Sequence, residues 1–226
     1  MPSYGQYCPV STAADVLGDR WTLLIMREMV AGSTRFNELE RALPRISRSL
    51  LSQRLRQLTR AGIVDSVPLL SGRGNEYRLT AAGKDLEPVL LAMGDWAARW
   101  ILDEPRTEDL DPTFLMWWIH RRVNLDQVPP GRTVMRFDVL VPRREVYWLV
   151  LTPEEVSLCM TDPGFDVDVQ VTADCMALQR VYAGWSELSD ALADGTIVAD
   201  GRSALVRRWP SWFAWSPFRE TVQARV

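Results

Sequence analysis

The sequence predicts an α+β protein built from two domains. Its 226 residues and 47% hydrophobic content are enough to bury two cores of ordinary size. Apolar residues recur at helical spacing through the first half, with one pair of short strands, whereas the second half is a run of strands followed by helices. A segment rich in acidic residues and proline, 103–112, separates the two. We therefore expect an N-terminal domain over residues 1–105 and a C-terminal domain over residues 106–226, the latter with a mostly antiparallel sheet.

Three short helices are expected at the start of the chain. Ser11 can cap a helix that runs to Leu17, and Asp19 can cap a second one that ends at Gly32. The third runs over 36–43, where Pro44 stops it because the proline ring excludes helical geometry.

The next helix, which Ser47 can cap, has two chemically different sides. Leu50, Leu51, Leu55 and Leu58 share one sector at 100° per residue. The other sector carries Arg48, Ser49, Ser52, Gln53, Arg56, Gln57 and Arg60. Guanidinium and carboxamide groups match base edges in a major groove, and serine hydroxyls suit bases or phosphates. Arg54 projects into the leucine sector, so we expect it to pair with an acid such as Glu28 or Glu38.

A hairpin follows this helix. Gly62 provides a left-handed exit, residues 63–70 and 76–79 read as strands, and a glycine-rich turn joins them. Arg73 at the tip and Arg78 on the returning strand can reach a phosphate or the minor groove. Helix, turn, helix and hairpin in this order predict a winged helix-turn-helix that binds double-stranded DNA. The predicted DNA-binding residues are Arg35, Arg45, Ser47, Arg48, Ser49, Ser52, Gln53, Arg56, Arg60, Arg73 and Arg78. The alternative is a solvated arginine-rich helix beside an ordinary hairpin.

Charge and composition narrow the function further. The net charge is −3, but the segment from Arg35 to Arg60 contains seven arginines and only two glutamates. A locally basic surface can therefore still bind phosphate. There is no signal-peptide pattern and no apolar run long enough for a membrane span, so we expect a cytoplasmic protein. Three cysteines and a single histidine, His120, lack metal-ligand spacing. With no acid, base or nucleophile grouping, we expect no enzyme activity and no cofactor.

The first hundred residues contain five characteristic motifs: C-P-V at 8–10, D-V-L-G-D-R-W-T-L-L-I at 15–25, R-F-N-E-L at 35–39, L-S-Q-R-L-R-Q-L at 51–58 and E-Y-R-L-T-A-A-G at 76–83. Together these motifs resemble the HxlR-type winged-helix regulators. The resemblance implies a homodimer formed by the N-terminal helix and a long helix over 81–102. A suitable apolar stripe on that long helix consists of Leu86, Val89, Leu90, Met93, Trp96, Ala97 and Trp100. The same stripe could instead be core.

Cys8 aligns with the cysteine that some members of this family use to sense electrophiles or oxidants. Sensing requires an exposed thiol with a depressed pKa, which a sequence does not reveal. A structural or vestigial role is the alternative.

The pattern of the C-terminal domain predicts both helices and strands. The expected elements are a helix over 114–122, strands over 132–141, 145–151, 156–160 and 166–172, helices over 173–183 and 187–193, a strand over 197–200, and a final helix broken by Pro210. Valines alternate with polar residues along strand 166–172, so we expect Asp166 and Asp168 to face solvent.

The end of this domain contains three further motifs: C-M-A-L-Q-R-V-Y-A-G at 175–184, D-A-L-A-D-G-T-I-V-A-D-G at 190–201 and S-A-L-V-R-R-W at 203–209. In this order they are similar to the end of sterol-carrier-protein-like domains. The resemblance implies an apolar tunnel and a hydrophobic small-molecule effector. The candidate ligand-binding residues are Trp117, Trp118, Trp148, Trp185, Trp209 and Trp212. Large rings are equally suited to a core or an interface.

Two functions from different classes remain open. The first is a DNA-binding transcriptional regulator controlled by a hydrophobic ligand of the C-terminal domain. The second is a lipid or acyl-chain carrier in which the winged helix serves only for dimerisation.

Overall fold

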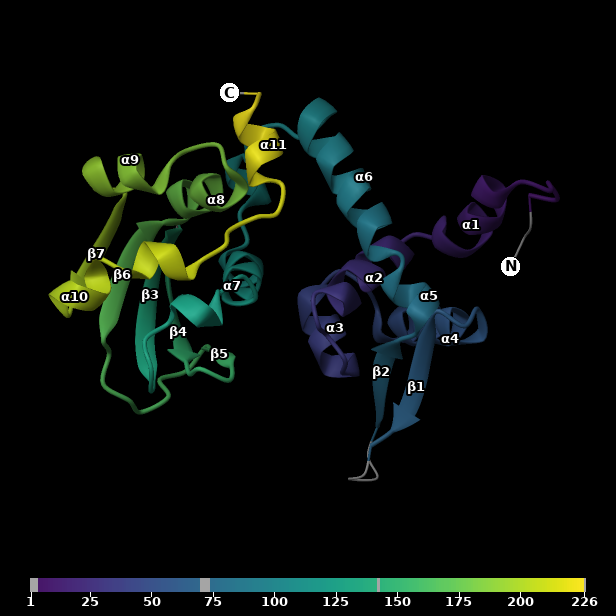
Figure 1. Ribbon diagram of the computed structural model, residues 1–226, viewed down its shortest axis with the longest axis horizontal. Helices are drawn as coiled ribbons and strands as arrows, with labels where there is room; N and C mark the ends of the chain where they lie inside the picture. Colours follow the sequence, from purple (N-terminus) through teal and green to yellow (C-terminus); the bar gives the residue numbers. More distant parts are fainter. Residues whose placement is uncertain (1–3, 70–73, 142, 226) are drawn as a thin grey trace. The chain divides into compact units, whose positions relative to one another are not determined.

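The computed structural model describes residues 4–69, 74–141 and 143–225, and it divides into two compact units, 1–93 and 94–226 (Figure 1). The division falls inside a helix, whereas the sequence analysis placed the domain boundary after it, in the acidic segment. Each unit has its own hydrophobic core. No helix in the described part of the chain is long and apolar enough to cross a membrane.

The first unit is mostly helical, with one antiparallel hairpin. Its elements are α1 (Pro9–Leu17), α2 (Thr22–Val30), α3 (Phe36–Ala42), α4 (Arg48–Arg60), β1 (Val64–Pro68), β2 (Asn75–Leu79), α5 (Ala81–Lys84) and the first half of α6 (Glu87–Trp100). The expected order of helices and strands is confirmed as far as β2, with shifts of a few residues at the ends. The single long helix expected over 81–102 was wrong, because a turn at residues 85–86 divides it into α5 and α6.

The core of the first unit is built by α2, α3, α4 and β1. Leu51, Leu55 and Leu58 of α4 are buried there, which confirms the leucine side of that helix. Gly62 ends the α4 segment with φ of +72°, a conformation that glycine adopts without strain. Burial of one leucine contributes roughly 1.5–3 kcal/mol, so the leucine side fixes which face of α4 remains at the surface.

Two expected helix caps were wrong. The first helix starts at Pro9, which suits a first helical position, and Cys8 takes the cap position that was expected for Ser11. The second helix, α2, starts at Thr22, and Trp21 takes its cap position. Asp19 does not cap α2 with its side chain, which forms an ion pair with Arg54. The predicted partners of Arg54 were therefore wrong as well. Glu28 pairs with Arg27, and Glu38 accepts hydrogen bonds from the backbone N–H groups of Thr34 and Arg35.

The second unit is a sheet with helices packed against it. After the second half of α6 its longer elements are α7 (Pro112–His120), β3 (Thr133–Val141), β4 (Arg143–Leu151), β5 (Val156–Cys159), β6 (Val169–Asp174), α8 (Cys175–Ala183), α9 (Leu188–Ala193), β7 (Ile197–Gly201), α10 (Ser203–Val206) and α11 (Arg219–Gln223). Short 3-10 turns lie at Thr107–Asp109, Leu125–Gln127 and Trp209–Trp212. Three short segments thus replace the single broken helix that was expected at the end.

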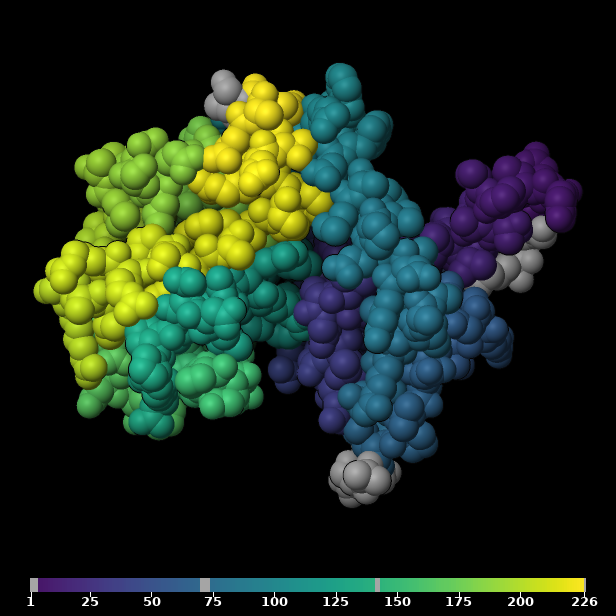
Figure 2. Space-filling view, in the orientation of Figure 1, coloured from purple at the N-terminus to yellow at the C-terminus, as the bar shows by residue number. Residues whose placement is uncertain are grey.

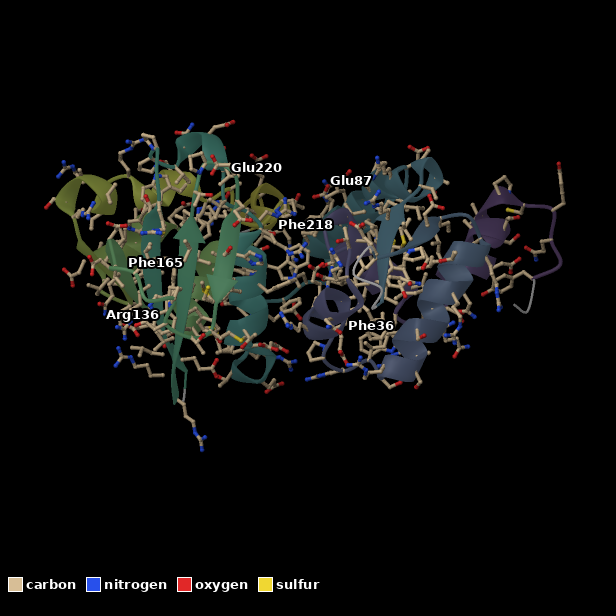
Figure 3. The ribbon with its side chains drawn as sticks, turned by 90° about the horizontal axis from the view of Figure 1, so that it is seen from below. Phe36, Glu87, Arg136, Phe165, Phe218 and Glu220 are labelled. Carbon is tan, nitrogen blue, oxygen red and sulfur yellow. The ribbon has the colours of Figure 1, made fainter. Side chains whose placement is uncertain are left out.

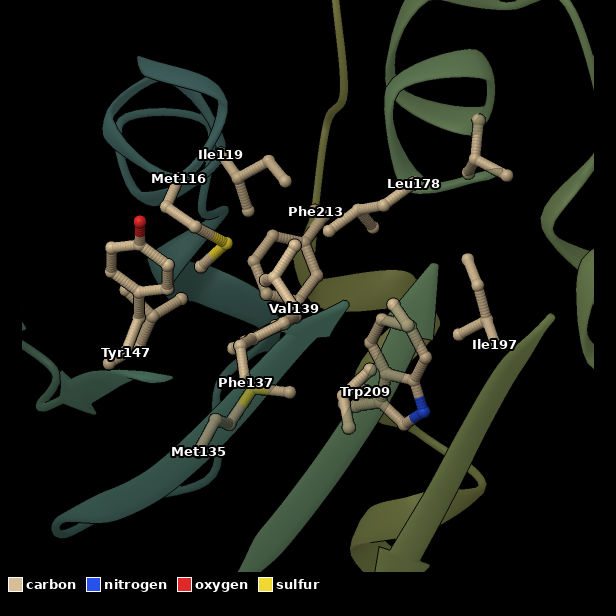
Figure 4. Close-up of a cluster of buried hydrophobic side chains, with 14 of the residues drawn as sticks. Met116, Ile119, Met135, Phe137, Val139, Tyr147, Leu178, Ile197, Trp209 and Phe213 are labelled. Carbon is tan, nitrogen blue, oxygen red and sulfur yellow. The ribbon is translucent and has the colours of Figure 1, made fainter. Parts of the chain in front are cut away.

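The sheet has five strands in the order β5-β4-β3-β6-β7. The β3–β6 pair is parallel and the other pairs are antiparallel, so the expected mixed α+β class is confirmed. One face of the sheet carries Met135, Phe137 and Val139 of β3 into a core shared with α7, α8 and the turn at Trp209 (Figure 4). Inward and outward side chains alternate along each strand, which is why one face can be wholly apolar.

The expectation that Asp168 faces solvent was wrong, because its side chain is buried. Its side chain accepts a hydrogen bond from the backbone N–H of Val134 at 2.8 Å and pairs with Arg202 at 3.0 Å. Only 7% of Asp168 is exposed, and β6 begins one residue after it. A buried carboxylate must be hydrogen-bonded or paired, and both conditions are met here.

Candidate nucleic-acid interface

The α3–turn–α4 segment presents one polar side of α4 to solvent. Ser47 accepts a hydrogen bond from the backbone N–H of Leu50 at 3.3 Å, which confirms the expected cap. Arg48, Ser49, Gln53, Arg56 and Arg60 are exposed, and Ser52 is half-buried. The exposed groups are donors and acceptors of the kinds that contact base edges and phosphates.

Two of these arginines are held in place by neighbouring side chains. Arg56 donates to the Ser52 hydroxyl at 2.7 Å. Arg48 pairs with Glu40, and its guanidinium lies 5.1 Å from the centre of the Phe36 ring (Figure 3). An exposed ion pair contributes only about 0–1 kcal/mol, so Glu40 can release Arg48 to a phosphate at little cost.

Arg54 orients α4 from its inner side. Its side chain is 13% exposed and pairs with Asp19 on the loop before α2. Arg54 also donates to Gln57 Oε1 at 2.7 Å. The Nη1 group of Arg54 is therefore bound within the protein, and the side chain does not belong to the exposed polar side of α4.

The hairpin forms a second wall beside α4. In its register Ser66 lies opposite Tyr77, and Asn75 Nδ2 donates to Ser66 Oγ at 2.7 Å. Burial raises the pKa of the Tyr77 phenol although the Arg56 charge opposes this, so the hydroxyl keeps its proton and can donate. A hollow of about 400 Å³ lies between the two walls, lined by Ser52, Arg56, Thr59, Arg60, Ser66, Asn75 and Tyr77.

Some residues that line the hollow were not predicted from the sequence. Thr59, Ser66, Asn75 and Tyr77 were not among the predicted residues, although alternation along the two strands places Ser66 and Tyr77 on one face. What the strand pattern could not supply is the pairing register, because an off-by-one register would turn every side chain to the other face.

Three other predicted DNA-binding residues, Arg35, Arg45 and Arg78, are not among the residues that line this hollow. Arg35 and Arg45 are exposed, and Arg35 forms an isolated backbone bridge with Glu76. The side chain of Arg78 donates to Glu76 at 2.7 Å, and this hydrogen bond holds the pKa of the Glu76 carboxyl below its ordinary value. Arg73 lies outside the described residues.

Cys8 borders a different, more apolar hollow of about 560 Å³ in the first unit. The lining residues are Tyr7, Cys8, Pro9, Thr12, Ala13, Val16, Leu17, Ile63, Ala82 and Leu86. The thiol occupies the cap position of α1, where hydrogen bonds from the backbone of Ser11 and then Val10 hold its pKa below the ordinary value. Such a thiol has a larger thiolate fraction at neutral pH than an unperturbed one.

The six candidate ligand-binding tryptophans fall into two groups. Trp209 and Trp212 are buried in the core of the second unit, where Trp209 packs edge-on against Phe213 at 5.9 Å. The other four, Trp117, Trp118, Trp148 and Trp185, are half-buried. Nearby His120 is kept neutral, because burial and the charge of Arg121 lower its pKa to about 4. Among the residues that the structure describes, no His, Cys, Asp and Glu side chains gather as a metal site would require.

The α3–turn–α4 pair, with its exposed polar helix face and adjoining hairpin, defines a winged helix-turn-helix protein. The profile of the HxlR-like helix-turn-helix family matches residues 16–105. The HTH-type transcriptional regulator YvaP of Bacillus subtilis is 41% identical over 113 residues, which are 49% of this chain and 95% of that protein. The chain therefore belongs to the HxlR-like helix-turn-helix family of transcriptional regulators.

Two further similarities are of the same kind. YdeP, another HTH-type transcriptional regulator of Bacillus subtilis, is 36% identical over 41% of this chain and 73% of its own length. The solved structure of the reduced transcriptional regulator YodB from B. subtilis is 33% identical over 42% of this chain and 96% of that one, with a TM-score of 0.38. The second unit lies almost wholly outside the residues that the family profile matches.

Proposed function

We propose that this protein is a cytoplasmic, dimeric transcriptional regulator that binds operator DNA through α4 and the β1–β2 hairpin. The observation that carries the proposal is the exposed polar side of α4 beside the hollow that the hairpin closes. Arg48, Ser49, Ser52, Gln53 and Arg56 contact bases or phosphates from the helix. Arg73 extends these contacts from the hairpin tip.

The hollow between α4 and the hairpin suits a backbone phosphate. It offers the guanidinium group of Arg60 together with the protonated hydroxyl of Tyr77. Phosphate contacts fix the position of a protein on the duplex, whereas base contacts supply sequence specificity. Arg56, which also lines the hollow, and the exposed Gln53 are then left to read bases.

DNA binding by a dimer sets a geometric requirement. Two recognition helices must lie about 34 Å apart, one helical turn of DNA, to occupy two half-sites. An effector changes DNA affinity only if it binds more tightly to one spacing of the helices than to another.

The first test is DNA binding by arginine variants. We expect Arg56→Ala to weaken binding to the region upstream of the protein's own gene by roughly 1–3 kcal/mol, and to do so in a sequence-dependent way. Arg73→Ala should weaken binding more uniformly and reduce the salt dependence by about one phosphate contact. Gel shifts over a salt series against specific and random duplexes measure both effects.

Arg207→Ala is the matched control. Arg207 is an exposed arginine of the second unit, so the substitution removes the same charge far along the chain from α4. Equal effects of Arg207→Ala and Arg56→Ala, or no arginine dependence at all, would contradict the proposal.

We further propose that the second unit, as a sterol-carrier-like domain, binds a hydrophobic effector. In support, Trp212 is fully buried and its indole N–H has no hydrogen-bond partner among the described residues. An unsatisfied buried donor costs about 1–3 kcal/mol, which an acceptor on a ligand would recover. A ligand reaches Trp212 only if the core opens, whereas it can reach the half-buried tryptophans without such a change.

The lipid or acyl-chain carrier remains the alternative function. Two measurements on one preparation of the purified chain distinguish the carrier from the regulator: solvent extraction followed by mass spectrometry, and gel shifts with DNA. Abundant extracted lipid with no DNA affinity would favour the carrier, whereas arginine-dependent DNA affinity favours the regulator.

Cys8 suggests a second input signal. Its lowered pKa and its position at an apolar hollow favour reaction with an electrophile that carries an apolar body, such as a quinone. Covalent modification there would place the adduct in the hollow that α1 lines together with Ile63 and Leu86.

A further inference from the structure

The short C-terminal helix α11 and the residues on either side of it, Phe218 and Arg225, contact the second half of α6. Both segments belong to the second unit, and in Figure 2 the yellow C-terminal segment lies against the blue-green end of α6. The interaction consists of an aromatic ring packed on the α6 backbone, a hydrogen bond between two side chains, and an arginine bound to carbonyl groups at the end of α6.

The apolar part is a ring against helix backbone. A side chain at Gly94 would meet the Phe218 ring at 2.2 Å, so the ring occupies the space where a Cβ would be. Glycine inside a helix costs about 1 kcal/mol relative to alanine. The close approach of Phe218 gives a packing reason for glycine at this position.

The polar parts bind the same side of α6. Thr221 Oγ1 donates to Asp95 Oδ1 at 2.7 Å. Arg225 Nη1 donates to the carbonyl oxygens of Ala98 and Leu102, at 2.7 Å each. The last carbonyls of a helix lack intrahelical partners and carry partial negative charge, so a guanidinium there satisfies and stabilises the helix end.

The other side of α11 is fixed to α8 and to the loop that follows it. Arg219 donates to the carbonyl oxygen of Val181 and pairs with Glu187 at 2.7 Å. The loop passes so close that a Cβ at Gly184 would lie 2.6 Å from the Arg219 carbonyl oxygen. Val222 is buried. The helix therefore joins α6 to the body of the second unit from two sides.

α6 is also part of the first unit. Leu86 just before the helix and Leu90 in it pack against the core that supports α4. Its Val89, Met93, Trp96 and Trp100 are exposed at spacings of four, three and four residues. These spacings place them on a stripe separate from the Gly94–Asp95–Ala98 side that α11 covers.

We propose that α11 is a clamp through which the second unit controls α6, and through α6 the affinity for DNA. The inference rests on the proposed function, because it requires that α6 forms the dimer that places the recognition helices. An effector or a modification that loosens α11 changes the restraint on α6 without touching the DNA-binding residues. A coupling of this kind typically changes affinity by about 5- to 150-fold.

The test compares two variants of the full chain that weaken the clamp in different ways. Phe218→Ala removes the ring, and Thr221→Val with Arg225→Gln removes the polar contacts. Glu220→Gln is the control, since Glu220 is an exposed residue of α11 outside these contacts. Hydrogen exchange of α6 amides and gel shifts with DNA from upstream of the protein's own gene are measured on each.

We expect faster exchange over 94–102 in both clamp variants, unchanged protection of α4, and a change in DNA affinity of at least about fivefold in the same direction. Faster exchange with unchanged DNA affinity would overturn the coupling alone. Unchanged exchange in both variants would show that these contacts do not hold α11, and would overturn the clamp. A wild-type chain without DNA affinity would overturn the proposed function itself, and with it the coupling.

Discussion

Cys8 and Cys175 show how the surroundings of a thiol set its reactivity. The Cys8 pKa is lowered by backbone hydrogen bonds at the start of α1, with Ser11 the largest contributor. Burial, and then the charge of Asp174, raises the pKa of Cys175 to about 12. The thiolate is the nucleophile, so Cys175 is unreactive near neutral pH while Cys8 is favoured.

This contrast predicts which substitution removes a response to electrophiles. Treatment with a quinone should reduce DNA binding by the wild-type chain. It should do the same to the control variant Cys159→Ser, which lacks only the half-buried thiol on β5. Cys8→Ser should keep its DNA binding, because the hydroxyl does not react. Gel shifts before and after treatment measure the response, and mass spectrometry locates the adduct. Equal release of DNA by Cys8→Ser would remove Cys8 as the sensor.

At the scale of an element, α4 depends on three independent restraints. Its leucines are buried, its first turn is capped by Ser47, and Arg54 holds its inner side against Asp19. Together they fix both the start of the helix and its rotation about its axis. The direction of Arg48, Gln53 and Arg56 follows from that rotation.

Ser47 allows the cap to be separated from DNA contact. We expect Ser47→Ala to lower the free energy of unfolding by about 1 kcal/mol, because one backbone N–H of the first turn loses its acceptor. Ser47→Asp should retain the stability, since aspartate also caps helices, yet weaken DNA binding by placing a negative charge near phosphate. Denaturant unfolding and gel shifts on both variants give the two quantities. Undiminished DNA binding by Ser47→Asp would place Ser47 away from the DNA backbone.

The organisation of α6 belongs to the scale of the whole molecule. One side contacts the core of the first unit, a second contacts α11, and a third leaves Trp96 and Trp100 exposed at 57% and 66%. In α1 none of the residues is buried, and Tyr7 and Val10 are exposed as well. Large exposed apolar residues on two helices are typical of a surface that another chain covers.

A second copy of this chain is the partner that we expect on that surface. Trp96→Glu should shift the protein toward monomer, because it places a charge in an apolar contact. It should weaken operator binding for the same reason, since two half-sites require two recognition helices. Arg99→Glu on the exposed polar part of α6 is the control. Sedimentation velocity over a concentration series measures the state, and a wild-type chain that stays monomeric throughout would contradict the prediction.

Periodicity and turn residues were sufficient to predict most of the elements, including α4. The order from α2 to β2, the leucine side of α4 and the Ser47 cap all follow from local sequence. Such features depend on residues a few positions apart, and backbone geometry relates their directions. The polar side of α4 could be predicted for the same reason.

The long-range contacts were decided only by the tertiary structure. The pairing of Arg54 with Asp19, the burial of Asp168, the hollow that includes Tyr77 and the contact of α11 with α6 join residues distant in sequence. Several acids could compensate one buried arginine equally well by charge, and only packing selects among them. The sequence by itself determined the helix α4, with its leucine side and its side of arginine, serine and glutamine. The fold determined its orientation and which elements bind α6, because these depend on distances that no local pattern contains.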